Sequence, residues 1–412
     1  MAGVSHYDDL ETRDPAEREA ALFAALPAHL ERARRGSPAM ARRLEGIETD
    51  GISNREGFAR IPVLRKSELA ELQRQDPPFG GFGSRDAAVS HVFASPGPLY
   101  EPAGEGDFAS FARALWAAGF RRGDLVYNTF SYHFTPAGVM VDAGARTLGC
   151  SVFPAGTGQT ELQVAAIADL KPAGYAGTPS FLKILLEKGI ETGADTSSVN
   201  KALVSGEALP AALREFFSSR GVSVLQCYTT AELGVVAYES DAREGLIVNE
   251  GLILEIVRPG TGDPVPDGEV GEIVVTNLHS APYPLARFGT GDLSAVLTGT
   301  SPCGRTNVRI RGWLGRADQS AKVRGMFVHP GLVARVVRRH PEVRRARLVV
   351  RSENDADEMT LRCETEAPAA DLAGRLVESL REVCKLRGEV ELVAPGTLPN
   401  DGKVIEDLRP IP

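Results

Sequence analysis

Hydrophobic and polar positions along residues 107–228 predict helices and strands in alternation. Short apolar runs bounded by turn residues are typical of buried strands, and apolar positions three or four apart are typical of helices. We expect strands at 125–127, 150–153, 202–204 and 222–225, helices near 107–119, 139–148, 160–170 and 211–219, and a further helix that starts at 178–179. Such alternation predicts a doubly wound, mainly parallel sheet of the α/β class.

Several of these helices carry recognisable start signals. Asp107 is expected to cap the first of them. Thr160 and Gln163 have the spacing of a capping box. Thr178-Pro179 places proline at the first position of a helix, which is where helices tolerate it best.

The pattern changes twice in the second half of the chain. After residue 245, two apolar runs, 252–257 and 272–275, flank a turn rich in Pro, Gly and Asp, which predicts a β-hairpin in a smaller β region. After residue 318, strands mix with helices near 331–339 and 371–386 in a compact α+β unit. We therefore expect a large N-terminal domain, 1–317, and a small C-terminal α+β domain, 318–412.

Bulk composition excludes several classes of protein. The chain has 412 residues, 43% of them hydrophobic, and a formal net charge of −8, which argues against a nucleic-acid-binding surface. No apolar run reaches the roughly 18 residues of a membrane span, and the N-terminus lacks the basic and apolar regions of a signal peptide. Five cysteines without a CxxC pair favour free thiols in a cytoplasmic protein, with Cys303 as a turn residue. The first 60 residues predict a helix over 15–45 and carry no functional motif.

An acidic motif follows a predicted strand at residues 228–232, which read Tyr-Thr-Thr-Ala-Glu. Open α/β sheets bind ligands beyond the carboxyl ends of their strands. There, Tyr228 can stack on an adenine, and Glu232 can hold Mg²⁺ against a phosphate. Taken alone, the motif is better explained as a corner between a strand and a helix with an incidental acid.

Two further motifs are also ambiguous when taken singly. Asp292 lies in Gly-Thr-Gly-Asp and can accept the hydroxyls of a ribose, although aspartate beside glycine is common in turns. Lys403 lies in Pro-Asn-Asp-Gly-Lys near the C-terminus and can stabilise charge that develops on a carboxylate and a phosphate. A solvated lysine in a tail is the alternative.

The order and spacing of these motifs resemble those of the adenylate-forming superfamily of acyl-CoA synthetases, adenylation domains and luciferases. Within it, the chain looks most similar to the phenylacetate–CoA ligase family, from about residue 60 to the end. The matching segments are Arg65-Lys66, 128–132, 176–180, 205–207, 228–234, 289–292, 303–306, 315–318, 322–325 and Gly402-Lys403.

The resemblance implies roles for individual residues. Lys403, Glu232 and His133 would be catalytic, Glu232 would also hold Mg²⁺, and Asp318 would be the hinge of a mobile small domain. The implied cofactor-binding residues are Ser95, Gly97, Ser205, Gly206, Glu207, Tyr228, Thr229, Thr230, Asp292, Arg316, Lys322, Arg324 and Gly325. The implied substrate pocket comprises Tyr132, Phe134, Gly177, Thr178 and Pro179.

The chain departs from the family in the phosphate loop. The family loop is rich in Ser, Thr and Gly and ends in Gly-Lys, whereas residues 93–102 here read Phe-Ala-Ser-Pro-Gly-Pro-Leu-Tyr-Glu-Pro. Ser95 and Gly97 remain, but the threonine pair and the lysine are gone. Backbone N–H groups can still bind phosphate, although proline removes such donors. Ala231 also replaces a family Ser or Thr.

The resemblance implies an ATP-dependent acid–CoA ligase that activates an aromatic (aryl or arylalkyl) carboxylate as its acyl-AMP and then forms the CoA thioester. The expected cofactors are ATP or AMP, Mg²⁺ and coenzyme A, with no nucleic acid or membrane as partner and a homodimer left open. Two alternatives remain. The first is an adenylating enzyme that passes the acyl group to a carrier protein or an amine. The second is a non-catalytic scaffold with an altered phosphate loop.

Overall fold

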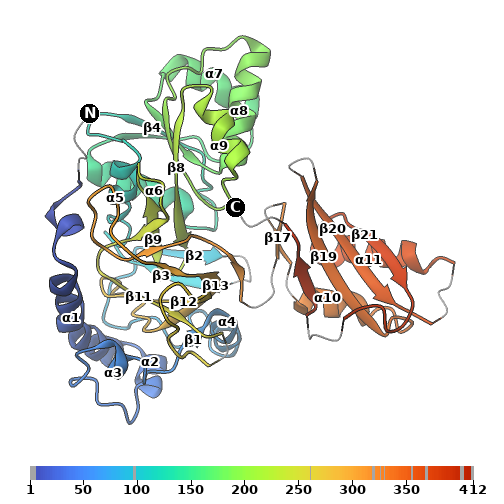
Figure 1. The fold of residues 1–412 in the computed structure, drawn as a ribbon, viewed down its shortest axis with the longest axis horizontal. Helices are drawn as coiled ribbons and strands as arrows, with labels where there is room; N and C mark the ends of the chain where they lie inside the picture. The colour runs from blue at the N-terminus through green and yellow to red at the C-terminus, as the bar shows by residue number, and fades with distance from the viewer. Residues whose placement is uncertain are drawn as a thin grey trace. The chain divides into compact units, whose positions relative to one another are not determined.

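The computed structural model describes residues 6–95, 99–259, 261–317, 321–324, 326–328, 330–353, 356–366, 370–399 and 403–409. The chain forms two compact units, a large one over Met1–Leu314 and a small one over Gly315–Ile411 (Figure 1). Each unit has a hydrophobic core of its own. No helix in the described part of the chain is long and apolar enough to cross a bilayer.

A nine-stranded sheet forms the upper part of the large unit in Figure 1. Its parallel half confirms the predicted doubly wound fold, and beyond β8 the strands pair antiparallel. In spatial order the strands are β14 (Val296–Leu297), β15 (Arg309–Ile310), β10 (Leu246–Val248), β9 (Gly234–Glu239), β8 (Ser223–Thr230), β7 (Lys201–Val204), β6 (Gly174–Gly177), β4 (Leu125–Asn128) and β5 (Ser151–Pro154).

Helices cover both faces of the parallel strands. Alternate strand residues point to opposite faces, and Val126 packs in the cluster of α5 and α6, whereas Tyr127 packs in that of α7, α8 and α9. Leu203 and its neighbour Ala202 divide in the same way. The helices are α5 (Phe111–Ala117), α6 (Ala137–Leu148), α7 (Thr160–Leu170), α8 (Pro179–Thr192) and α9 (Ala211–Ser218).

Three local predictions about helix starts and ends were wrong. α5 begins at Phe111, because the Asp107 carboxylate accepts the Gly104 N–H at 2.8 Å and closes a turn instead of capping a helix. α7 has no capping box, since the Gln163 amide donates to the carbonyls of Gly156 and Gly158. The predicted 15–45 helix is two helices, because the Ser37 hydroxyl accepts the Met40 N–H and starts a second one.

A four-stranded path forms the β region of the large unit. It runs β1 (Leu64–Arg65), β13 (Phe288–Ser294), β12 (Gly271–Asn277) and β11 (Leu252–Val257), and β11 and β12 make the predicted hairpin. The 3₁₀-helix η1 (Asp9–Thr12) precedes the helices α1 (Pro15–Gly36), α2 (Pro38–Arg43), α3 (Arg55–Phe58) and α4 (Lys66–Gln75). A separate two-stranded hairpin comprises β2 (His91–Ser95) and β3 (Leu99–Ala103).

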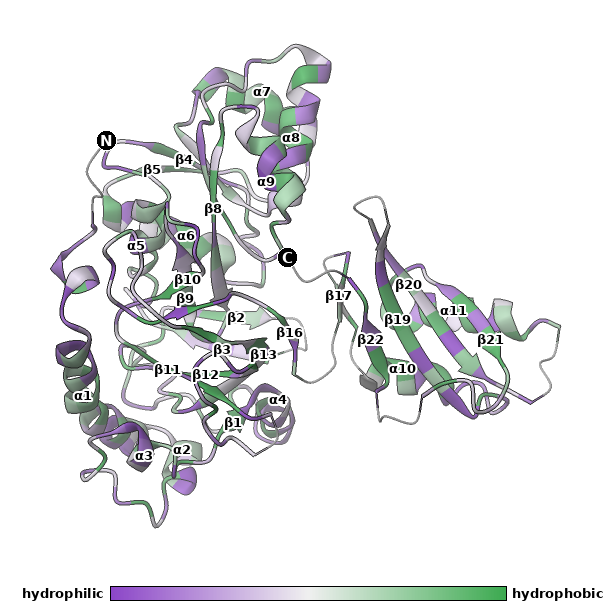
Figure 2. Ribbon diagram, viewed as in Figure 1, coloured by the Kyte–Doolittle hydropathy of each residue, from purple (hydrophilic) through white to green (hydrophobic). Residues whose placement is uncertain are grey.

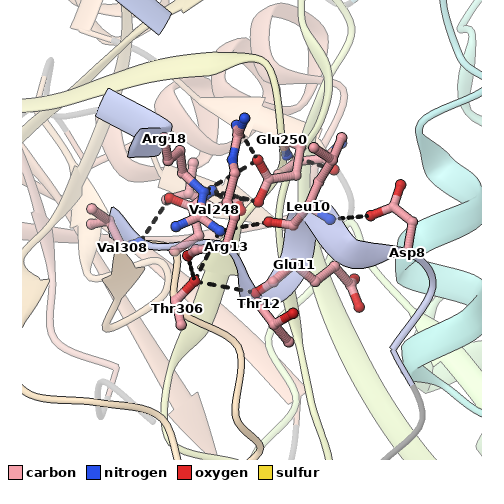
Figure 3. A network of polar contacts seen from close by, with 12 residues as sticks. Asp8, Leu10, Glu11, Thr12, Arg13, Arg18, Val248, Glu250, Thr306 and Val308 are labelled. Carbon is pink, nitrogen blue, oxygen red and sulfur yellow. Dashed lines mark hydrogen bonds and ion pairs between the residues drawn. The ribbon is translucent and has the colours of Figure 1, made fainter. Parts of the chain in front are cut away.

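The N-terminal segment is held against the large unit by buried ionic contacts (Figure 3). Arg18 Nε donates to Glu250 Oε1 at 3.1 Å, and both side chains are almost fully buried. The Thr306 hydroxyl donates to the Arg13 carbonyl. These contacts join residues 232 and 293 positions apart, so this segment has a structural role that no sequence motif indicated.

The small unit is an α+β sandwich. Its sheet has the order β21 (Glu389–Val393), β20 (Ala356–Glu364), β19 (Arg345–Glu353) and β22 (Ile405–Asp407), with the helices α10 (Pro330–Val337) and α11 (Leu372–Cys384). Figure 2 shows hydrophobic and hydrophilic residues alternating along β20, and Leu372, Leu376 and Leu380 of α11 are buried in the core. The short strands are β16 (Gly315–Arg316), β17 (Ala321–Val323) and β18 (Met326–Val328).

Candidate active site

The carboxyl end of β8 carries the predicted adenine motif. The Ser205 hydroxyl, just after β7, donates to the Cys227 carbonyl at 2.7 Å and lies 3.1 Å from the Thr229 hydroxyl. The Thr230 hydroxyl accepts the Leu233 N–H at 3.3 Å and closes the turn that follows. These bonds fix the backbone around Tyr228, which is largely buried.

Tyr228 and Asp292 lie in direct contact although they come from different sheets. The Tyr228 hydroxyl donates to Asp292 Oδ2 at 2.7 Å. The structure thus joins two of the predicted motifs, on β8 and β13, into one site. A carboxylate has about four acceptor positions, so Asp292 keeps capacity for ribose hydroxyls.

Trp313 is a member of this site that sequence reasoning missed. Its indole Nε1 donates to Asp292 Oδ1 at 2.9 Å, so both carboxylate oxygens are oriented by aromatic donors. The sequence signal for Trp313 is weak and consists only of its position three residues before Arg316, a predicted cofactor-binding residue. An indole N–H can only donate a hydrogen bond, which suits the Asp292 carboxylate as its acceptor.

Glu232 is paired with Lys66, the first residue of α4. Lys66 Nζ lies 2.8 Å from Glu232 Oε1, and the Glu232 side chain is completely buried. Burial acts to raise the pKa of Glu232, but the charge and hydrogen bond of Lys66 act against it, so that the net pKa lies below its usual value. Glu232 is therefore a buried anion that already faces a cation.

Glu101 lies beside this pair, on the hairpin at the place of the altered loop. Ser95 Oγ donates to Glu101 Oε1 at 2.6 Å, and the residue is only 2% exposed. Burial, and next the charge of Glu232, raise the pKa of Glu101 to about 8. Glu101, Glu232 and Ser95 thus bring two acids and a hydroxyl together, and the sequence gave no reason to single out Glu101.

The predicted acyl-pocket residues lie on the loop between β4 and α6. Asn128 Nδ2 donates to the Tyr132 hydroxyl at 2.8 Å, and burial raises the pKa of that hydroxyl to about 12. His133 is exposed, and its backbone N–H donates to Ser131 Oγ. Phe134 is 81% exposed with φ of 62°, and its carbonyl accepts the Ala94 N–H at 2.8 Å. This last bond links the acyl loop to the hairpin.

Close packing explains the small residue in the Gly177–Pro179 segment. A Cβ on Gly177 would come within 2.0 Å of the Thr129 hydroxyl and 2.2 Å of the Tyr175 hydroxyl, so only glycine fits. Thr178 caps α8 and Pro179 is its first residue, as predicted. The start of α8 also contacts the 205–207 segment, because Glu207 Oε2 accepts the Ser180 N–H at 3.3 Å. Gly206, the residue before Glu207, has a φ of 81°.

The remaining predicted residues belong to the small unit or lie outside the described residues. Lys403 is exposed, and Arg316 lies in β16. Arg324 has φ of 48°, and its backbone N–H and Nε donate to Asp357. Lys322 lies in β17. Gly97, Asp318 and Gly325 lie outside the described residues.

Comparison with known proteins identifies the family. The family model described as AMP-binding enzyme matches residues 106–282. The phenylacetate-coenzyme A ligase of Thermus thermophilus is 34% identical over 339 residues, which cover 78% of this chain and 75% of that protein. The chain belongs to the phenylacetate–coenzyme A ligase family.

Other relatives extend this match over the whole chain. The phenylacetate-coenzyme A ligase of Escherichia coli is 27% identical over 100% of this chain and 99% of its own length. A solved 2-hydroxyisobutyryl-CoA ligase, in complex with 2-HIB-AMP and CoA, has a TM-score of 0.83 and 27% identity and covers 98% of this chain and 92% of its own. The predicted family and fold class, and the expectation of an AMP-forming acid–CoA ligase, are confirmed.

Proposed function

We propose that this member of the phenylacetate–coenzyme A ligase family joins an aromatic carboxylate to coenzyme A through an acyl adenylate. The observation that carries the assignment of its site is the Tyr228–Asp292 hydrogen bond, which brings the predicted adenine and ribose residues together at the carboxyl end of β8. Dinucleotide folds hold ribose hydroxyls with an acid in the same way. Tyr228 would then face the adenine and Asp292 the ribose.

In the first half-reaction, a carboxylate oxygen of the acid attacks the α-phosphorus of ATP. A new P–O bond forms, the bond to the pyrophosphate oxygen breaks, and the electron pair leaves with pyrophosphate. Lys403 is assigned to stabilise the negative charge that builds up on the reacting oxygens, because fixed positive groups act strongly where charge develops. In the second, the CoA sulfur attacks the acyl carbon and AMP leaves, after a rotation about Asp318.

The residues present fit a magnesium ion. The buried Glu232 carboxylate already holds a positive charge, the Lys66 ammonium, at 2.8 Å. Mg²⁺ usually takes one or two carboxylates and completes its shell with phosphate oxygens and water. Among the described residues, no group of three His, Cys, Asp or Glu is arranged as a metal site. Bound there, Mg²⁺ would neutralise phosphate charge.

The assignment of an aromatic acid rests on Tyr132 and Phe134 of the acyl loop and on the relatives named as phenylacetate ligases. The solved relative is named for a branched aliphatic acid instead. A panel of phenylacetate, benzoate and 2-hydroxyisobutyrate distinguishes the two classes. Phenylacetate is expected to give the highest kcat/KM, and a clear preference for the aliphatic acid would contradict the assignment.

The test of the ligase itself is release of pyrophosphate and formation of acyl-CoA. Lys403→Ala should abolish adenylate formation, and Lys385→Ala, an exposed lysine of the same unit, should leave it unchanged. Equal rates in the two variants would remove Lys403 from the mechanism. No turnover with any acid, together with no ATP–Mg²⁺ binding by calorimetry, would favour the scaffold alternative.

Two further points of the proposal have their own tests. Product analysis without CoA shows whether an amine or carrier protein is the acceptor, because acyl-CoA cannot then form. We also place the protein in the cytoplasm, which suits five free cysteines. Sedimentation velocity decides whether the chain forms a homodimer.

A further inference from the structure

The hairpin β2–β3 carries an acid where a site for phosphate needs positive charge. Residues 91–103 contain neither lysine nor arginine, and Glu101 is their buried charged group. A buried carboxylate that faces a phosphate would repel it, because like charges interact strongly where water is excluded. A compensating positive charge, from a proton or a cation, is therefore required if this hairpin contacts the nucleotide.

Glu101 and Glu232 line the same small cavity. Oxygen-bearing side chains of Asp107, Asn277 and Ser280 complete its polar lining. The cavity has a volume of about 10 Å³, which is about the space that one bound water or ion needs. The cavity thus suits a single water molecule or ion.

One oxygen of Glu101 is left without a partner. Ser95 Oγ binds Oε1 at 2.6 Å and fixes the carboxyl group, while Oε2 is buried and has no hydrogen-bond partner among the described residues. Buried polar atoms in folded proteins are nearly always satisfied. An unsatisfied carboxylate oxygen in a cavity with a second carboxylate is a place where both acids could hold one cation.

We propose that Glu101 and Glu232 bind one divalent cation together, and that this ion supplies the positive charge which the hairpin lacks. Lys66 keeps its contact with Glu232 Oε1 in this arrangement. Carboxylate oxygens are the ligands that Mg²⁺ and Mn²⁺ prefer. The inference rests on the proposed function for its purpose, but its new element, the second carboxylate from Glu101, is tested without substrate.

The experiment is a titration of nucleotide-free protein with Mn²⁺, followed by the electron paramagnetic resonance signal of the free ion. The wild type is expected to bind one Mn²⁺ saturably. Glu101→Gln should weaken that binding at least tenfold, while Glu105→Gln, an exposed acid on the same segment, should match the wild type. Glu101→Asp keeps a carboxylate and should bind more tightly than Glu101→Gln.

Two results would overturn the proposal. Either the wild type binds no Mn²⁺ saturably, or Glu101→Gln and Glu101→Asp both bind as the wild type does, in which case the acids form only a structural pair. Circular dichroism confirms that the variants are folded. Because no nucleotide or acid is present, failure of this site and failure of ligase activity are separate outcomes.

Discussion

Replacing Lys66 by methionine should destabilise the large unit through Glu232. The change removes the ammonium that lies 2.8 Å from a completely buried carboxylate and leaves a side chain of similar length. Removing one partner of a buried ion pair costs about 3–5 kcal/mol. Because Lys66 is 28% exposed and its contact is partly screened, we expect a loss at or just below the lower end of this range, about 2–3 kcal/mol.

The loss should depend on pH with a defined sign. Lys66 contributes to holding the pKa of Glu232 below its usual value, so this pair stabilises the fold above the unfolded pKa and the stabilisation is lost on acidification. Without Lys66, burial raises that pKa, and the variant gains stability as Glu232 takes up a proton. The difference between the two proteins should therefore be largest near pH 7–8 and shrink toward about pH 5.

The assay is denaturation by guanidinium followed by tryptophan fluorescence. Both tryptophans of the chain, Trp116 and Trp313, lie in the large unit, so the signal reports the unfolding of that unit alone. The double variant Lys66→Met/Glu232→Gln is the matched control, because it removes the buried charge as well. It should recover most of the loss. An equal loss in the single and double variants would refute the role assigned to the ion pair.

Three other outcomes are expected. Trp313→Phe removes the donor to Asp292 and should raise the KM for ATP about tenfold, equivalent to about 1.4 kcal/mol. The KM for 2′-deoxy-ATP or 3′-deoxy-ATP should rise less. Equal increases for all three nucleotides would contradict the positioning role of Trp313. Arg287→Met should lower the stability of the large unit by at least about 3 kcal/mol, measured by the same denaturation, because Arg287 binds Glu255 and three backbone carbonyls while fully buried. Ellman's reagent at neutral pH should label the thiols of the native protein slowly and all five thiols after unfolding. Burial raises the pKa of Cys227 and Cys363 to about 12 and that of Cys384 to about 11. Rapid labelling of the native protein would contradict this burial.

The parallel half of the large sheet could be predicted because each signal there is local. A buried strand such as 202–204 is a short apolar run, and the Thr178-Pro179 pair fixes a helix start within its own four residues. The same local logic failed where a side chain found a different partner. Asp107 and Gln163 have the chemistry of caps, but each bonds the backbone of a neighbouring turn.

The candidate site was predicted only where motif and geometry coincide. Tyr228 and Asp292 were each named from a motif, yet their hydrogen bond joins residues 64 positions apart and has no trace in the sequence. Trp313 was missed, and Lys66 was noted only in a matching segment without a role, because the acceptors of both donors lie far away in the sequence. Glu101 was visible only as part of a departure from the family loop.

The charges of Lys66, Glu101 and Glu232 suggest how the altered loop could still serve a nucleotide. Lys66, Glu101 and Glu232 come from α4, β3 and the turn after β8, so the sequence separates groups that the fold brings together. With Glu101 ionised they hold one positive and two negative charges, an imbalance that burial makes costly and that raises the pKa of Glu101. A divalent cation reverses the sign of the total and makes the cluster attractive to phosphate. A lysine at position 101 would also give the cluster a net positive charge, without a second carboxylate. A loop with lysine and a loop with Glu101 and a cation would therefore offer the nucleotide the same net charge, and only the second would depend on the metal.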